Sequence, residues 1–287
     1  MSPVGWREWR AQGCQRLRDA LVDDPDQEIR WIIEQATGRT AAAQAGALDE
    51  PATEREVRHF TDMVDRRVAG EPLQYVLGRW GFRTLDLLVD PRVLIPRPET
   101  EGVVALAIEA LAAVNGPAIA VDLGTGSGAI ALSLAAECWP HIELWATDVS
   151  IDALAVARAN LAALGRRAAG VRLEAGSWYA ALPPDLRGRV DVIVSNPPYV
   201  AASELLPAEV ADWEPHAALV SGPGGLEHIE VIVNGAGEWL TAAGVVVVEI
   251  GETQGPAVVQ LAAQNGFGRA TVHPDLAGRP RVLVAQR

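Results

Sequence analysis

The sequence predicts an α/β protein with a mostly parallel sheet, helices on both faces of that sheet, and a small helical domain before it. From residue 117 onward, short apolar segments alternate with longer helical ones, and right-handed crossovers turn such alternation into a parallel sheet. Before about residue 70 the apolar residues recur instead at three- and four-residue spacings, as in helices. Residues 266–287 hold two strand-like segments whose connection is too short for a crossover helix, so we expect an antiparallel pair at the C-terminal edge.

The N-terminal part ends in a helix with recognisable start and stop signals. Thr53 and Glu56 have the spacing of a capping box, and four apolar residues follow on one helical face: Val57, Phe60, Val64 and Val68. Gly70 and Pro72 end this helix. We therefore expect a helical domain over 1–72, a hairpin or extended connector over 73–92, and the α/β domain over 93–287.

Within the α/β domain, a proline-stiffened loop leads into a helix over 102–114. The segments predicted as strands are 118–124, 142–148, 171–176, 189–196 and 244–251. The segments predicted as intervening helices are 128–139, 150–165 and 225–240.

Composition narrows the kinds of partner and site. The formal net charge of −13 disfavours a nucleic-acid groove, because phosphate binding needs Lys and Arg to displace counterions. No window has the roughly 18 uninterrupted apolar residues of a membrane span, and the N-terminus lacks the apolar core of a signal peptide, so we expect a cytoplasmic protein with no membrane contact. The two cysteines form no C-x-x-C pair and the five histidines show no ligand spacing, so no metal is expected.

A glycine-rich loop follows the first strand of the sheet. Gly124, Gly126 and Gly128 allow close backbone approach to a ligand at a helix N-terminus. Their G-x-G-x-G spacing differs from the dinucleotide fingerprint G-x-G-x-x-G, which argues against a dehydrogenase. Asp148 ends the next strand, where a carboxylate can accept hydrogen bonds from ribose hydroxyls. Its alternative role is to cap the following helix, for which Ser150 is a competing candidate.

The fourth strand ends in the sequence SNPPY at 195–199. The Asn196 side-chain oxygen and the Pro197 carbonyl can each accept one hydrogen of a planar –NH2 group, and the Tyr199 ring can lie against its plane. Such acceptors would stabilise the positive charge that grows on the nitrogen as it attacks. The Tyr199 face can also favour a nearby sulfonium cation. The alternative is a strand terminator with a packed tyrosine.

Together these features resemble the class I S-adenosylmethionine-dependent methyltransferases, whose sheet is Rossmann-like, and the sequence resembles their PrmC/HemK family over nearly its whole length. The matching motifs are GEPLQYVLG at 70–78, VLIPRPETE at 93–101, DLGTGSGAIAL at 122–132, SNPPYV at 195–200 and GGLEHI at 224–229. The resemblance implies methyl transfer from S-adenosyl-L-methionine to the side-chain nitrogen N5 of the glutamine in the Gly-Gly-Gln motif of peptide chain release factors, the protein methylation linked to translation termination. It further implies a substrate-recognition role for 1–72 and a catalytic role for 93–287. We expect the protein to be a monomer.

The resemblance also assigns roles to individual residues. Cofactor binding falls on Gly124, Thr125, Gly126, Ser127, Gly128, Asp148, Trp178 and Asn196. Substrate binding falls on Asn196, Pro197, Pro198 and Tyr199, of which Asn196, Pro197 and Tyr199 carry catalysis. Where the family commonly has Asp before the aromatic residue, this sequence has Ser177, so Trp178 is expected as a wall for adenine and the contact of Ser177 with adenine stays open.

Two alternatives remain for the function. An adenine-N6 or other nucleic-acid amino methyltransferase could use the same corner on a flipped base, although the acidic composition argues against it. A non-catalytic binding module with a methyltransferase fold is the second. Arg97 and Glu99 could either close over the substrate or hold their own loop in place.

Overall fold

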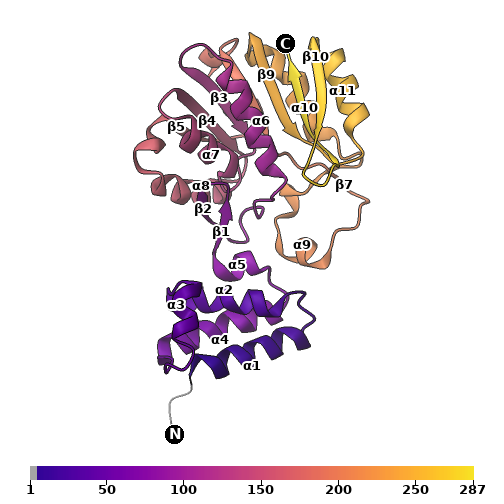
Figure 1. Ribbon diagram of the computed structural model, residues 1–287. Helices are drawn as coiled ribbons and strands as arrows, with labels where there is room; N and C mark the ends of the chain where they lie inside the picture. The colour runs from indigo at the N-terminus through magenta and orange to yellow at the C-terminus, as the bar shows by residue number, and fades with distance from the viewer. Residues whose placement is uncertain (1–4) are drawn as a thin grey trace. The chain divides into compact units, whose positions relative to one another are not determined.

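The computed structural model describes residues 5–287, which divide into two compact units (Figure 1). One unit contains the chain up to Arg79 together with Pro207–Trp213, and the other contains Trp80–Leu206 and Glu214–Arg287. Nothing in the sequence predicts that the short internal segment Pro207–Trp213 belongs to the first unit. No helix within residues 5–287 is long and apolar enough to cross a membrane.

The first unit is helical. Its helices are α1 (Trp6–Asp19), α2 (Pro25–Thr37), α3 (Ala41–Gly46), α4 (Glu54–Val68), α5 (Leu73–Leu77) and α9 (Ala208–Trp213). The predicted capping box is present: the Glu56 amide donates to Thr53 Oγ1 at 3.3 Å and the Thr53 amide donates to Glu56 Oε2 at 2.9 Å. Phe60 and Val64 are buried as expected, whereas Val68 at the end of α4 is exposed.

Residues 73–92 differ in part from the predicted connector. Residues 73–77 form the short helix α5 rather than an extended chain, because Pro72 begins the helix and Gly78 ends it in the left-handed region at φ 70°. The strands β1 (Arg79–Phe82) and β2 (Leu85–Leu88) then form the expected two-stranded hairpin.

The second unit is built on a seven-stranded sheet in the order β10-β11-β9-β6-β3-β4-β5. The strands are β3 (Ala118–Leu123), β4 (Ile142–Asp148), β5 (Val171–Ala175), β6 (Val190–Ser195), β9 (Leu240–Glu249), β10 (Arg269–Pro274) and β11 (Pro280–Gln286). All pairs from β5 to β9 are parallel, with Val121 facing Trp145 in β4 and Ile193 in β6. The predicted mostly parallel sheet with an antiparallel C-terminal edge is thus confirmed.

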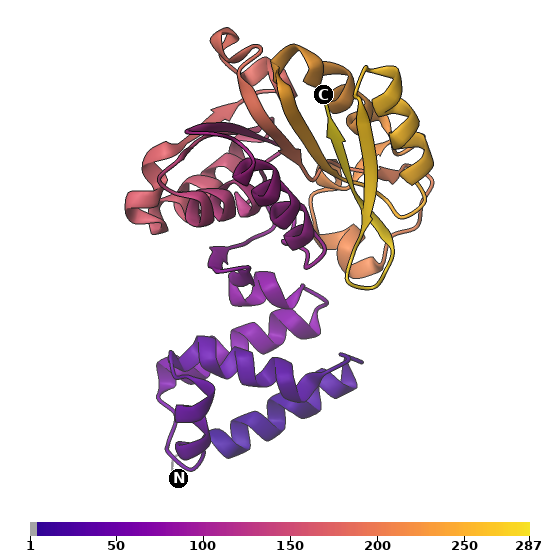
Figure 2. The ribbon, with the colours of Figure 1, turned by 45° about the horizontal axis from the view of Figure 1, so that its top comes forward.

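The C-terminal edge has one feature that the sequence did not predict. β11 lies between β9 and β10 and is antiparallel to both, so β10 is the outermost strand and runs in the direction of β9. In Figures 1 and 2 the yellow strands β10 and β11 lie at the opposite end of the sheet from β5.

Helices cover both faces of the sheet, and each face has its own apolar core. Alternate residues of β3 point to opposite faces, Ala120 into one core and Val121 into the other. The first face carries α6 (Thr100–Ala112), α7 (Ala129–Cys138) and α8 (Ile151–Ala163); the second carries α10 (Glu227–Trp239) and α11 (Gly255–Gln264). A further parallel pair, β7 (Val200–Ala201) and β8 (Val220–Gly222), follows the SNPPY corner.

The strand order determines where a ligand can bind. From β3 the chain moves outward through β4 to β5 and then crosses back to β6 on the other side of β3. Open α/β sheets bind ligands beyond the carboxyl ends of the strands at such a switch point. The loops after β3, β4, β6 and β9 all leave this edge.

Candidate active site

The glycine loop between β3 and α7 has an unusual backbone that only glycine adopts without strain. Gly124, Gly126 and Gly128 have φ values of 77°, 56° and 87°, all in the left-handed region. The amides of Gly124 and Thr125 both donate to the Thr147 carbonyl of β4 at 2.9 Å, which anchors the loop to the neighbouring strand. A Cβ atom added at Gly126 would meet nothing within 4 Å, so the loop is open to a ligand there.

Asp148 at the end of β4 is joined to this loop. Its Oδ2 accepts a hydrogen bond from the Gly126 amide at 2.9 Å, and its Oδ1 accepts one from the Ser150 amide at 2.8 Å. Ser150 Oγ itself accepts from the Ala153 amide at 3.1 Å and caps α8, so Asp148 is not needed as that cap. Burial raises the pKa of Asp148, and the backbone hydrogen bonds oppose this rise. Each carboxylate oxygen keeps further acceptor capacity for a ligand hydroxyl.

The Asp122 side chain stabilises the glycine loop through hydrogen bonds. It is fully buried, and its Oδ2 accepts hydrogen bonds from the Thr125 hydroxyl at 2.7 Å and the Ala131 amide at 3.1 Å. Its Oδ1 has no partner among the residues that the structure describes. Burial raises the pKa of Asp122 to about 7. These contacts support a role for Asp122 in orienting the glycine loop.

Trp178 lies beside the glycine loop. It follows β5, adopts a positive φ of 48°, and begins a short 3-10 helix over Trp178–Ala181. A Cβ atom added at Gly124 would lie 3.4 Å from the Trp178 ring, and the ring centroid lies 5.2 Å from that of His228. The ring can therefore form a wall of the space beside the loop. Ser177 is exposed and makes no side-chain capping bond.

The SNPPY corner is held by a chain of side-chain hydrogen bonds. Asn196 Nδ2 donates to Thr100 Oγ1 at 3.1 Å, and the Thr100 hydroxyl donates to Glu249 Oε2 at 2.7 Å. The Tyr199 hydroxyl donates to the other oxygen of the same carboxylate, Glu249 Oε1, at 3.2 Å. Pro197 is buried and Asn196 is half-buried, so the corner has one side against the protein and another side accessible.

Sequence reasoning missed Glu249 and Thr100. Glu249 is the last residue of β9 and only 1% exposed, and Thr100 is the first residue of α6. Burial raises the pKa of the Glu249 carboxyl, while Arg281 lowers it. Burial likewise raises the pKa of Tyr199 above its usual value. A carboxylate that ends the apolar run GVVVVE, at the same sheet edge as Asp148 and Asn196, was the signal that could have indicated this residue.

The loop before α6 is tied down by two ion pairs. Arg97 pairs with the buried carboxylate of Glu214, which also accepts from the Ile95 amide at 3.1 Å. Glu99 pairs with Arg279 of the β10–β11 turn at 3.0 Å. These contacts support the role of holding the loop in place for both Arg97 and Glu99.

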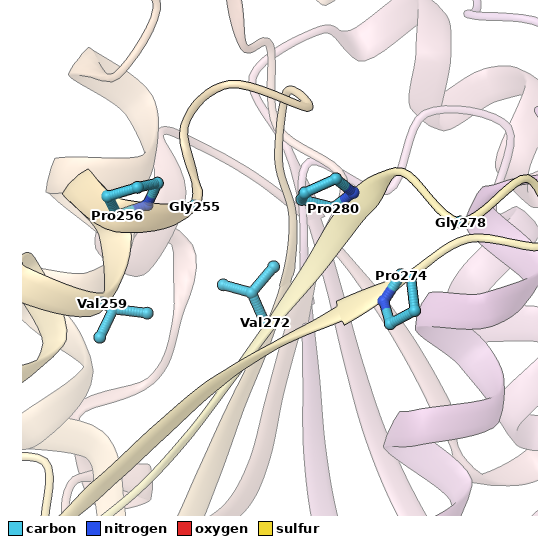
Figure 3. Close-up of a pocket in the computed structure, with 7 residues that line it drawn as sticks. All are labelled: Gly255, Pro256, Val259, Val272, Pro274, Gly278 and Pro280. Atoms are coloured by element: carbon cyan, nitrogen blue, oxygen red, sulfur yellow. The ribbon is translucent and has the colours of Figure 1, made fainter.

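A separate apolar pocket of about 410 Å³ lies between α11 and the β10–β11 pair (Figure 3). Its lining residues are Gly255, Pro256, Val259, Val272, Pro274, Gly278 and Pro280. None of the site residues predicted from the sequence lines this pocket, and it offers no titratable side chain.

The fold and this edge of the sheet define a class I methyltransferase: a seven-stranded sheet with one reversed strand, a glycine loop after the central strand and an acidic residue at the end of the next. Residues 8–78 match the family model described as PrmC N-terminal domain, and residues 104–212 match the one described as Methyltransferase small domain. The catalytic domain of hMettl16, solved in complex with the MAT2A 3'UTR hairpin 6, has the same fold, with a TM-score of 0.53, 15% identity, and coverage of 82% of this chain and 81% of that chain.

Relatives that match nearly the whole chain identify its family within this class. The release factor glutamine methyltransferase of Streptomyces coelicolor is 42% identical over 96% of both chains, and that of Moorella thermoacetica is 40% identical over 98% of both. The chain belongs to the release factor glutamine methyltransferase family. It is accordingly an enzyme of the methyltransferase class, a fold and family that use S-adenosylmethionine in general.

Proposed function

We propose that this enzyme transfers a methyl group from S-adenosyl-L-methionine to the side-chain nitrogen N5 of the glutamine in the Gly-Gly-Gln motif of peptide chain release factors. The observation that carries the proposal is the position of the Asn196–Tyr199 corner at the carboxyl end of β6, next to β3 and its glycine loop. The near-full-length similarity to release factor glutamine methyltransferases supports the same substrate.

The residues around the glycine loop fit the proposed cofactor. When bound, S-adenosylmethionine supplies an electrophilic methyl group on a sulfonium centre. The residues that would hold it are Gly124, Thr125, Gly126, Ser127, Gly128, Asp148, Trp178 and Asn196. The open face at Gly126 leaves room for the ligand, the Asp148 carboxylate can accept ribose hydroxyls, and the Trp178 ring can stack on adenine.

The corner itself would bind the glutamine. Asn196 Oδ1 and the Pro197 carbonyl would each accept one hydrogen of the substrate amide, while Pro198 stiffens the turn and the Tyr199 ring lies against the amide plane. An amide nitrogen is a poor nucleophile, and two preorganised acceptors stabilise the positive charge that develops on it. Positioning of the two reactants contributes on the order of 7–11 kcal/mol more. A methylated, charged amide loses its proton readily, so no strong base is required.

We assign the remaining roles by segment of the chain. The segment 1–72 would recognise the release factor, 73–92 would connect, and 93–287 would carry out catalysis, with the enzyme acting as a cytoplasmic monomer on a protein partner. The net charge of −13 supports a protein substrate rather than a nucleic acid.

The decisive experiment is mass spectrometry of a release factor after incubation with enzyme and S-adenosylmethionine. We expect one added methyl group on the glutamine of the Gly-Gly-Gln motif. Parallel incubations with DNA and RNA test the nucleic-acid alternative, and methylation of nucleic acid alone would refute the proposal. Calorimetry with S-adenosylmethionine tests the non-catalytic alternative, which an absence of binding would favour.

A further inference from the structure

We propose that Glu249 is a positioning residue which, through Thr100, holds the Asn196 side-chain amide with Nδ2 toward the protein and Oδ1 toward the substrate. This inference rests on the proposed function, because it explains how Asn196 presents an acceptor to the substrate amide. It concerns only residues of the second unit.

The orientation of Asn196 needs a cause. A carboxamide has nearly the same shape after a 180° rotation, but the rotation exchanges an acceptor oxygen for a nitrogen with two donors. With Nδ2 toward the substrate, two donor groups would face each other and the site could not bind an –NH2 group. Catalysis therefore requires a neighbour that distinguishes the two orientations.

The chain of hydrogen bonds behind Asn196 supplies this distinction. An ionised carboxylate can only accept hydrogen bonds, and Glu249 accepts one from the Tyr199 hydroxyl at Oε1 and one from the Thr100 hydroxyl at Oε2. Thr100 has a single hydroxyl hydrogen, which it donates to Glu249; the distance from Thr100 Oγ1 to Glu249 Oε2 is 2.7 Å. Only lone pairs of Thr100 remain for Asn196, so the atom that meets them at 3.1 Å must be the donor Nδ2.

The charge of Glu249 sets the direction of the chain. The charged groups that face it are Arg281 from β11, whose guanidinium lies 6.0 Å from the centroid of the Tyr199 ring, and Glu99 from the loop before α6. Arg281 favours the ionised carboxylate, whereas Glu99 and burial oppose it. A proton on Glu249 would let the carboxyl donate to Thr100, which could then donate to Asn196 and accommodate the rotated amide.

Variants of Thr100 test the proposal with little change in shape. Thr100→Val removes the hydroxyl and keeps the volume, so Asn196 loses the group that selects its orientation. We expect kcat for release-factor methylation to fall at least tenfold, with the dissociation constant of S-adenosylmethionine changed less than twofold by calorimetry. Thr100→Ser restores the hydroxyl and should recover most of the lost turnover. Ser133→Ala removes a buried hydroxyl that has no partner in the described structure and serves as the control for the loss of such a group.

Glu249→Gln tests the direction of the chain. The glutamine amide can donate to Thr100, so kcat should fall although size and hydrogen-bonding capacity are retained. Both substitutions interrupt the same chain of hydrogen bonds, so their effects should not multiply. We expect kcat of the double variant Thr100→Val/Glu249→Gln to lie within about twofold of kcat of the slower single variant. The wild type should also lose kcat toward acidic pH as Glu249 takes up a proton, and this limb should be absent in Glu249→Gln.

Three results would overturn the inference: near-normal kcat in Thr100→Val, equal losses in Thr100→Ser and Thr100→Val, or losses that multiply in the double variant. Failure of the proposed function looks different, because then the wild type itself would not methylate the glutamine.

Discussion

The Gly126 amide donates a hydrogen bond to Asp148 Oδ2 at 2.9 Å, which joins the glycine loop after β3 to the carboxylate that ends β4. The second carboxylate oxygen accepts from the Ser150 amide, so the two oxygens of Asp148 hold two separate backbone segments. The proposed cofactor site is therefore organised by the protein's own hydrogen bonds.

Asp148→Asn should weaken cofactor binding. Asparagine has one acceptor oxygen, so its NH2 group would face either the Gly126 or the Ser150 amide, donor against donor. Hydrogen bonds to charged groups contribute about 1.5–3 kcal/mol, so we expect the dissociation constant of S-adenosylmethionine to rise about ten- to hundredfold in calorimetry. Asp152→Asn removes an exposed carboxylate from the first turn of α8 and is the matched control. Equal affinity of wild type and Asp148→Asn would contradict the assignment.

Asn196→Ala should abolish methyl transfer while the cofactor still binds. The substitution removes the oxygen proposed to accept a substrate N–H, and it leaves the glycine loop and Asp148 in place. Loss of one such preorganised group costs roughly 10²–10³ in kcat. Single-turnover assays with release factor, together with calorimetry for S-adenosylmethionine, separate the two effects. A variant with near-normal turnover would refute the proposed amide clamp.

Gly128→Ala should destabilise the second unit, because Gly128 has φ 87° and an added Cβ atom would lie 2.9 Å from Leu132 Cδ1. We expect the free energy of unfolding in urea to fall by roughly 1–3 kcal/mol. Gly102→Ala is the matched control: Gly102 is exposed in α6, and an added Cβ atom meets nothing within 4 Å. This control should leave stability unchanged or raise it by up to about 1 kcal/mol. The same change in both variants would argue against the left-handed strain.

Asp122→Asn should remove a pH dependence of stability. The pKa of Asp122 is raised from 3.8 to about 7 in the folded protein, so between these values the folded state holds a proton that the unfolded state has released. The contribution of Asp122 is therefore fully present below pH 3.8 and is lost as pH rises toward 7, by about 4 kcal/mol in total at about 1.4 kcal/mol per pKa unit. Urea unfolding of ligand-free protein between pH 4.5 and about 7.5 checks this prediction. The free energy of unfolding of the wild type should fall relative to that of Asp122→Asn as pH rises across this range. Parallel plots of this free energy against pH for the two proteins would contradict the presence of a buried proton on Asp122.

Most of the sheet was predictable from the sequence because hydrophobic periodicity reports local conformation and burial. The five predicted parallel strands all appear, and the loop with Gly124, Gly126 and Gly128 adopts the left-handed backbone that its composition indicates. Residues 73–77 were the exception among the local predictions: their mixed composition suggested an extended chain, but Pro72 and Gly78 bound a single helical turn.

By itself, then, the sequence determined the α/β class, the glycine loop, the carboxylate at Asp148 and the SNPPY corner, because each depends on residues that are close together in the chain. Only the tertiary structure decided that β11 lies between β9 and β10, that α9 belongs to the helical unit, and that Ser150 rather than Asp148 caps α8. It also brought Thr100 and Glu249, 149 residues apart, to 2.7 Å behind Asn196. Such contacts depend on which elements pack side by side, and local periodicity carries no information about that choice.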